Sequence, residues 1–207
     1  MAPIKTFPFS DGKKLEIHHD IDPINPRVDF DNLGTMACFH KRYDLGDKDH
    51  GIDDEEFAGW DEMEEGIKKK NPDCVILPLF LFDHSGITIR TTSEQFRACD
   101  GAGWDWGQVG FIFITRNKIN EEYGEHCGRT NEQIEEYLRN EVALYDQYLT
   151  GDVYGFILRD KPCEHCDDET GDELDSCWGF FGSDPLENGM SDHLNEKYRT
   201  ELEKVCS

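Results

Sequence analysis

Basic residues are scarce in this chain. It contains 21 Lys and Arg against 45 Asp and Glu, which gives a formal net charge of −24. Binding to DNA or RNA requires Lys and Arg to replace the cations around phosphates, so we expect no direct contact with nucleic acid. The same charge attracts partners with a basic surface, among them proteins that handle nucleic acid. Solubility or a halophilic source would also explain the charge, without any partner.

Long apolar runs are absent too. No segment approaches the roughly 18 apolar residues that a membrane-spanning helix needs. The first residues, MAPIKTFPFSDGKK, contain no apolar signal-peptide core. We therefore expect no membrane contact and a cytoplasmic location. Thiols stay reduced in that compartment, so we expect the eight Cys to be metal ligands or buried thiols rather than disulfides.

The signatures of common catalytic sites are also missing. The sequence has no HExxH, no Walker loop, no dinucleotide-binding fingerprint and no nucleophile elbow. We therefore expect a protein that is not an enzyme. One alternative is a small metal-dependent, hydrolase-like enzyme whose site draws on the acidic turns of the chain. These turns contain Asp44, Asp47, Asp83, His84 and Asp105. A polar hairpin turn would explain Asp83 and His84 without any chemistry.

The hydrophobic pattern predicts a single α+β domain over residues 1–207, with a mainly antiparallel sheet and helices packed on one face. Residues 1–14 are expected to be a loose lead-in, followed by a short edge strand at 15–18. The other strands are expected near residues 33–40, 74–82, 86–90, 108–115, 153–159 and 174–181. The long helices are expected near residues 53–70, 130–149 and 186–204, the last of which Gly189 can divide.

The helix at 130–149 has the clearest signals. Thr130 and Gln133 have the spacing of a capping box, and Gly151 supplies a stop signal. Apolar residues recur every three or four positions between them, which predicts one buried face. These residues are Ile134, Tyr137, Leu138, Val142, Tyr145 and Leu149.

The helix expected at 53–70 carries the densest acidic surface in the sequence. Phe57, Trp60 and Ile67 recur on one face, which should be buried. The acidic residues off this face are Glu55, Glu56, Asp61, Glu62 and Glu65. We expect them to form the surface that binds a basic partner. The alternative is a helix face that is exposed only to water.

A CxxC pair lies in the connection between the last two strands. Cys163 and Cys166, with Cys177 eleven residues further on, could hold one structural Zn²⁺ on a small zinc-knuckle hairpin over residues 160–178. The candidates for the fourth ligand are His126 and Cys127. Free thiols are the alternative. A redox dithiol is disfavoured because the neighbouring acids oppose the thiolate form, and a zinc deaminase would also need an upstream HxE.

Several motifs follow one another along most of the chain. They are NPR, DNLGTMACFHKRYDLGD, DHSG, GQVG, YDQYLTGDVYGF and DSCWGF. In wording and order they resemble a family of proteins carried by phages and prophages, for which no activity is established. The family has Ser where this chain has Trp106. The resemblance implies that the protein acts in the cytoplasm of a host cell.

Charge and resemblance together lead to one expected function. We expect a non-enzymatic, acidic phage-type protein, with a structural zinc ion, that binds and inhibits a host nucleic-acid-processing defence enzyme. In an anti-CRISPR or antirestriction role, the acidic surface could mimic nucleic acid and occupy the basic surface of the enzyme. The alternatives are the hydrolase-like enzyme described above and an accessory structural protein of a phage.

Overall fold

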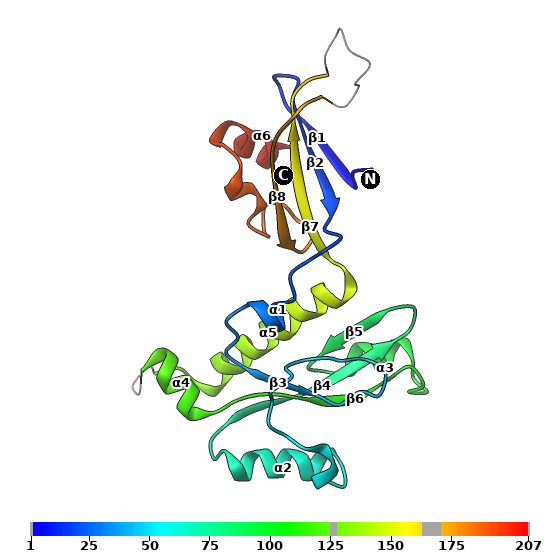
Figure 1. The fold of residues 1–207 in the computed structure, drawn as a ribbon, viewed down its shortest axis with the longest axis vertical. Coiled ribbons are helices and arrows are strands. Elements are labelled where there is room, and N and C mark those ends of the chain that lie inside the picture. Colours follow the sequence, from blue (N-terminus) through cyan, green and yellow to red (C-terminus); the bar gives the residue numbers. More distant parts are fainter. Residues whose placement is uncertain (1, 125–127, 163–170, 207) are drawn as a thin grey trace. The chain divides into compact units, whose positions relative to one another are not determined.

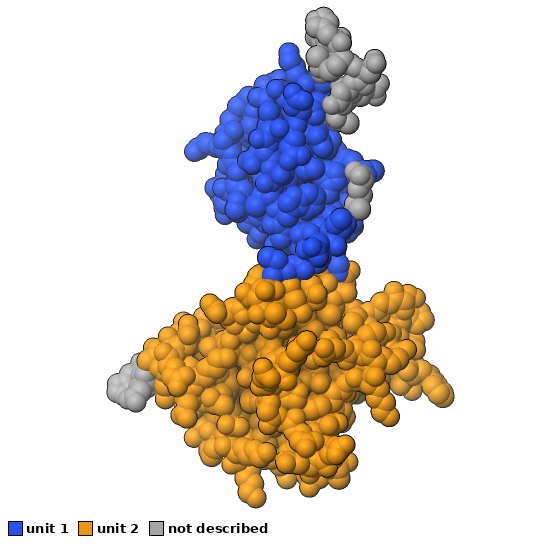
Figure 2. Space-filling model, in the orientation of Figure 1, with its two compact units in different colours: residues 1–24, 151–207 blue, residues 25–150 orange. Residues whose placement is uncertain are grey.

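The computed structural model of the chain describes residues 2–124, 128–162 and 171–206. The chain divides into unit 1 (Met1–Ile24 and Gly151–Ser207) and unit 2 (Asn25–Thr150), which Figure 2 shows in different colours. The fold is α+β, as expected, but the strands are shared between two antiparallel sheets, one in each unit. Whether both units unfold together, as the expected single domain, stays a prediction.

Unit 1 is built on a four-stranded antiparallel sheet with the strand order β1-β2-β7-β8 (Figure 1). The strands are β1 (Lys5–Pro8), β2 (Lys14–His19), β7 (Val153–Arg159) and β8 (Glu173–Phe181). Two expectations for the N-terminus are therefore wrong. The loose lead-in contains β1, and β2 is an inner strand between β1 and β7.

The N-terminal strands are held by contacts that the local sequence does not reveal. Phe7, Leu15 and Ile17 are buried in the same core as Phe156 of β7. Ile17 is the direct antiparallel partner of Phe156. Because this pairing joins the two ends of the chain, hydrophobic periodicity within either segment could not predict it.

Two C-terminal helices complete the core of unit 1. They are η2 (Met190–His193) and α6 (Glu196–Cys206). Met190, Tyr198 and Leu202 of these helices pack in the core with the strands. The helix expected at 186–204 is interrupted twice. Gly189, just before η2, has a left-handed backbone with φ of 85°, and Leu194, between η2 and α6, is extended, with φ of −88° and ψ of 149°.

Unit 2 contains the second antiparallel sheet, with the strand order β3-β6-β4-β5. The strands are β3 (Thr35–Cys38), β4 (Val75–Asp83), β5 (Ile87–Arg90) and β6 (Trp106–Ile114). The helices are α1 (Pro26–Asp29), η1 (Asp54–Glu56), α2 (Trp60–Lys70), α3 (Glu94–Cys99), α4 (Arg116–Tyr123) and α5 (Asn131–Thr150). None of the helices in the described part of the chain is long and apolar enough to cross a membrane.

Helices cover both faces of the sheet in unit 2, with α5 on one side and α2 on the other (Figure 1). Leu77, Leu79 and Leu81 of β4 pack in a core with residues of α5. Phe111 and Phe113 of β6 pack in a second core with residues of α2. The expectation of helices on one face is therefore wrong for this unit. The strands are apolar almost throughout, and a strand with two apolar faces buries both.

The starts of the two main helices differ in how well the sequence predicted them. Before α5, the backbone N–H of Gln133 donates to Thr130 Oγ1 (3.3 Å) and that of Thr130 donates to Gln133 Oε1 (3.0 Å), which confirms the capping box. In contrast, α2 begins only at Trp60, because the backbone at Gly59 is extended, with φ of 177°.

Candidate functional site

The acidic residues that we expected to bind a partner lie in and just before α2. They are Glu55, Glu56, Asp61, Glu62 and Glu65, and we refer to them as the acidic face of α2. All five are exposed, whereas Met63 and Ile67 of the same helix are buried. Glu62 accepts a hydrogen bond from the backbone N–H of Ala58 (2.7 Å), and Glu56 pairs with Lys70 (3.4 Å). The acidic face is therefore free of the core and open to a partner.

Most of the expected zinc ligands lie outside the described residues. These ligands are Cys163, Cys166, His126 and Cys127. Cys177 is described and packs against the core of unit 1. It lies four residues, or about 13 Å, along β8 from Glu173, the first residue of that strand. Packing alone therefore explains Cys177, and a zinc site at the hairpin stays a prediction.

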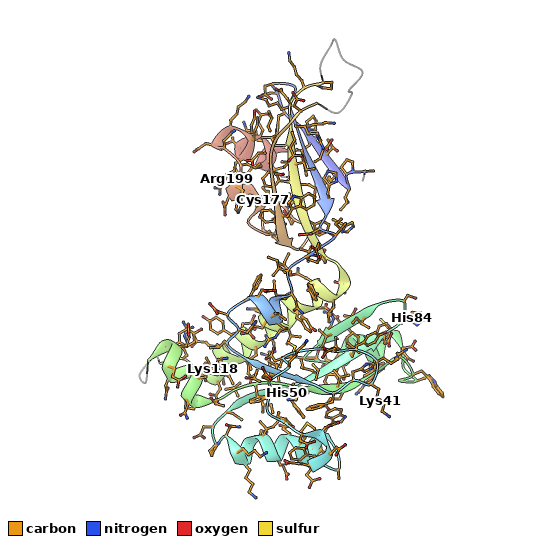
Figure 3. The ribbon with its side chains drawn as sticks, in the orientation of Figure 1. Lys41, His50, His84, Lys118, Cys177 and Arg199 are labelled. Atoms are coloured by element: carbon orange, nitrogen blue, oxygen red, sulfur yellow. The ribbon has the colours of Figure 1, made fainter. Side chains whose placement is uncertain are left out.

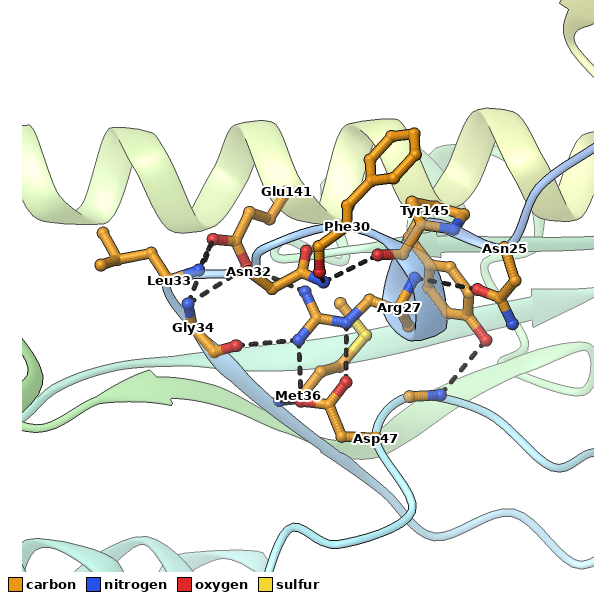
Figure 4. A network of polar contacts seen from close by, with 12 residues as sticks. Asn25, Arg27, Phe30, Asn32, Leu33, Gly34, Met36, Asp47, Glu141 and Tyr145 are labelled. Carbon is orange, nitrogen blue, oxygen red and sulfur yellow. Dashed lines mark hydrogen bonds and ion pairs between the residues drawn. The ribbon is translucent and has the colours of Figure 1, made fainter. Parts of the chain in front are cut away.

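A buried polar network in unit 2 joins the NPR and LGD motifs (Figure 4). Nε and Nη2 of Arg27 donate to the two carboxylate oxygens of Asp47, each at 2.8 Å. Nη1 donates to Glu141 of α5 at 2.8 Å, and Nη2 also donates to the carbonyl oxygen of Gly34 at 2.8 Å. The Arg27 side chain is only 1% exposed, so the network belongs to the interior of the unit.

Both carboxylates of the network also hold the backbone. Asp47 Oδ2 accepts a hydrogen bond from the backbone N–H of Met36 at 2.8 Å. Glu141 Oε1 accepts hydrogen bonds from the backbone N–H groups of Leu33 (2.6 Å) and Gly34 (3.1 Å). Asp47, a candidate for metal chemistry from the sequence, thus uses its carboxylate in structural hydrogen bonds.

The network keeps the guanidinium charged. Burial alone would lower the pKa of Arg27, but its hydrogen bonds and charge interactions with Asp47 and Glu141 outweigh burial and raise the pKa. The motif residues of NPR and LGD therefore have a clear role in the fold. The sequence around Arg27 gave no signal of this role, because its neighbour Val28 is exposed and its partners Asp47 and Glu141 lie 20 and 114 residues away.

The structure separates the residues of the hydrolase-like alternative. Asp44 and Asp47 line one hollow, whereas Asp83 and Asp105 line another. The side chain of Asp44 is 83% exposed and lies 3.8 Å from Lys48. Within the described residues, no three His, Cys, Asp or Glu side chains are placed to hold a metal ion together. The described part of the chain thus offers this alternative no metal centre.

Three motif segments meet at a hollow of about 260 Å³ in unit 2. These segments are FHKRY after β3, the end of β4 with DHSG, and the GWDWGQ segment that leads into β6. The polar lining residues are His40, Arg42, Asp83, Asp105 and Gln108, and the aromatic ones are Trp104 and Trp106. We refer to this feature as the tryptophan hollow.

Antiparallel pairing of β4 with β6 brings the acidic residues of the hollow together. The backbone N–H of Asp83 donates to the carbonyl oxygen of Asp105 at 2.7 Å. His84, labelled in Figure 3, then places its Nδ1 2.9 Å from Asp105 Oδ2. Asp83 accepts hydrogen bonds from Arg42 and from the hydroxyl group of Tyr43 (3.2 Å). Asp83, His84 and Asp105 were candidates from the sequence, whereas Arg42 is recognised only in the structure.

The loop before β6 is organised by Asp100. Its carboxylate accepts hydrogen bonds, at 2.6–3.2 Å, from the backbone N–H groups of Ala102, Gly103, Trp104 and Asp105. These bonds, that from Asp105 above all, lower the pKa of Asp100. Trp106 Nε1 donates to the carbonyl oxygen of Asp100 at 2.8 Å. The loop is therefore fixed, and it presents Trp104 with 87% of its surface exposed.

Unit 2 thus contains two candidate functional sites, the acidic face of α2 and the tryptophan hollow. Comparisons of the chain with protein families, curated proteins and solved structures find no match.

Proposed function

We propose that the chain is an acidic, non-enzymatic protein that binds the basic, nucleic-acid-binding surface of a host defence enzyme and inhibits it. The observation that carries this proposal is the acidic face of α2. Its five carboxylates lie on the solvent side of one short segment, away from the buried Met63 and Ile67. Carboxylates in such an array can take the place of phosphates opposite the Lys and Arg of a partner.

The charge of the whole chain supports long-range attraction to such a partner. Unit 1 has 19 acidic and 8 basic residues, and unit 2 has 26 and 13, so both contribute to the net charge of −24. A field of one sign speeds the encounter with an oppositely charged surface, and salt weakens it. The resemblance to phage-carried proteins motivates the choice of a host defence enzyme as the partner.

The proposal can be tested by reversing the acidic face of α2. The five residues Glu55, Glu56, Asp61, Glu62 and Glu65 would be changed to Lys together. Because each reversal adds two positive charges, the net charge would change from −24 to −14. Tagged protein would be incubated with lysate of a candidate host at low and high salt, and captured proteins identified. We expect capture of a nucleic-acid-binding enzyme that DNA or RNA displaces, that high salt releases and that the variant fails to bind.

A second variant with the same charge change separates the face from the net charge. It reverses five exposed acidic residues of unit 1 to Lys, namely Asp22, Asp172, Asp175, Glu187 and Glu196. We expect this control to retain most of the binding. Equal loss in both variants would mean that only net charge matters. If the α2 variant is folded and binds as the unchanged protein does, the acidic face is not the binding surface.

We also propose a structural zinc ion at the hairpin, held by Cys163, Cys166 and Cys177. Elemental analysis of the purified protein should then find about one zinc per chain, and Cys163→Ser should remove it and lower the melting temperature. Cys177→Ser tells the two roles of that residue apart. Loss of zinc identifies a ligand, whereas retention of zinc with lower stability identifies a core residue. Absence of zinc from the unchanged protein would refute the site.

A further inference from the structure

Trp104 is a large aromatic residue that lies at the surface and has no role in the packing of the core. Its side chain is 87% exposed, although burial of an indole against other apolar groups is strongly favourable. The backbone N–H of Trp104 donates to Asp100 at 2.6 Å, and the neighbouring backbone N–H groups bind the same carboxylate. An exposed aromatic ring on a fixed loop loses little conformational entropy when a ligand stacks on it.

The hollow beside Trp104 offers both donors and acceptors. Nδ1 of His84 pairs with Asp105 Oδ2 at 2.9 Å, and the other ring nitrogen, Nε2, remains for a ligand, as an acceptor or a donor according to the tautomer. Asp105 Oδ1 makes no hydrogen bond within the described part of the chain. Arg42 uses one Nη2 proton on Asp83, which leaves further N–H donors at the rim. Gln108 supplies an amide, which both donates and accepts.

The charges of the hollow select a neutral ligand. Asp83 is balanced by Arg42, and Asp105 lies against His84. An anion would meet two carboxylates in a unit that has 26 acidic and 13 basic residues. A cation would have to compete with Arg42 for Asp83 and with His84 for Asp105. A volume of about 260 Å³ is small for a ligand pocket, so it fits one ring better than a large molecule.

We propose that the tryptophan hollow binds one neutral saccharide unit, with Trp104 as the stacking platform. A sugar ring has an apolar C–H face that can cover the indole. Its hydroxyl groups donate and accept at once, as a set of mixed polar groups such as Asp105, Arg42 and Gln108 requires. A nucleobase offers fewer groups of this kind along its edge, and the phosphate of a nucleotide would be repelled. None of the lining residues belongs to α2, so this site is separate from the proposed partner surface.

The test uses the full chain and a panel of methyl glycosides of the common hexoses and N-acetylhexosamines. Binding would be followed by nuclear magnetic resonance through the indole N–H signal of Trp104, identified by its loss in Trp104→Phe. Adenosine, arginine amide and phosphate form the comparison panel. We expect at least one glycoside to shift this signal saturably, with a dissociation constant of about 1 mM, and the comparison panel to leave it unchanged.

Variants then locate the site. We expect Trp104→Ala to weaken glycoside binding by about tenfold, as measured on the Gln108 side-chain amide signals. Trp104→Tyr should retain most of the affinity, and Asp105→Asn should weaken binding, while Asp44→Asn, an exposed acid elsewhere in unit 2, should not. Because Trp104 is exposed, its replacement should leave the fold intact, so weaker glycoside binding by Trp104→Ala could not be attributed to unfolding. The proposal is overturned if no glycoside binds, if only adenosine, arginine amide or phosphate binds, or if Trp104→Ala binds as well as the unchanged protein.

Discussion

The network around Arg27 makes the sharpest prediction about stability. Arg27→Met keeps the length of the side chain but removes the charge and all four side-chain hydrogen bonds. Asp47 and Glu141 would remain, with side chains only 22% and 16% exposed. Neither carboxylate can move into water without releasing the backbone N–H groups that it binds. The substitution therefore leaves two largely buried negative charges without a counter-charge.

The expected loss of stability follows from that uncompensated charge. Removal of one partner from a buried ion pair costs about 3–5 kcal/mol. Because both carboxylates keep some contact with water, we expect a loss of about 3 kcal/mol, near the lower end. A domain of this size has about 5–15 kcal/mol of total stability, so the variant should remain folded but unfold at a clearly lower urea concentration.

Urea denaturation followed by circular dichroism measures this loss, and Arg139→Ala is the matched control. Arg139 is 41% exposed and pairs with Glu135 one turn away on α5. Loss of such a surface pair should cost only about 0.3–0.5 kcal/mol. A triple variant, Arg27→Met with Asp47→Asn and Glu141→Gln, removes the stranded charges as well. It should be more stable than Arg27→Met alone.

Two outcomes would refute this reasoning. If Arg27→Met costs no more than Arg139→Ala, the network does not stabilise unit 2. If the triple variant is less stable than Arg27→Met alone, the loss comes from missing hydrogen bonds and not from uncompensated charge.

Two further predictions concern a glycine and a titrating carboxyl group. Gly110→Ala should lower the free energy of unfolding, measured by urea denaturation, by at least about 2 kcal/mol, because φ at Gly110 is 157° and a methyl group there would overlap the carbonyl oxygen of Ala37. Gly107→Ala, also in β6 but with open space around it, should lower it far less. Equal losses in the two variants would contradict this prediction. In unit 1, the hydrogen bond from Lys197, aided by those from Lys13 and Tyr198, lowers the pKa of Asp11 to about 2. A carboxyl group whose pKa is lower in the folded state stabilises that state above its unfolded pKa near 3.8 and stops doing so as the pH falls to about 2. The stability difference between the unchanged protein and Asp11→Asn should therefore be constant above pH 5 and shrink between about pH 4 and pH 2; a difference that does not change with pH would show that Asp11 does not titrate in this way.

Local signals in the sequence were enough to place most helices and strands. Thr130 and Gln133 predicted the start of α5 because a capping box uses only atoms three residues apart. The apolar segment at 74–82 predicted β4 for a similar reason, since its composition favours a strand wherever it is packed. The scarcity of Lys and Arg was likewise a property of composition alone.

Pairing between distant segments was decided only by the tertiary structure. β2 pairs with β7 in one sheet, whereas β6 lies between β3 and β4 in the other. The alternation of apolar residues along a strand shows which side is buried, but it does not identify the neighbouring strand. The division into two sheets was therefore beyond the sequence.

The two sites differ in the same way. The acidic face of α2 lies within one short stretch of sequence, Glu55 and Glu56 in η1 and the other three in α2, so the sequence could name Glu55, Glu56, Asp61, Glu62 and Glu65. The tryptophan hollow needs three separate segments. It exists only because β4 pairs with β6 and because Phe39, after β3, stays against β6 through a hydrogen bond from its backbone N–H to the carbonyl oxygen of Val109. The sequence by itself determined the charge, the capped helix and the acidic face, since these depend on composition and on neighbours within a few residues. The tertiary structure alone decided that Arg27 meets Asp47 and Glu141, and that Arg42, Asp83 and Trp104 share one hollow, because long-range strand pairing sets those distances.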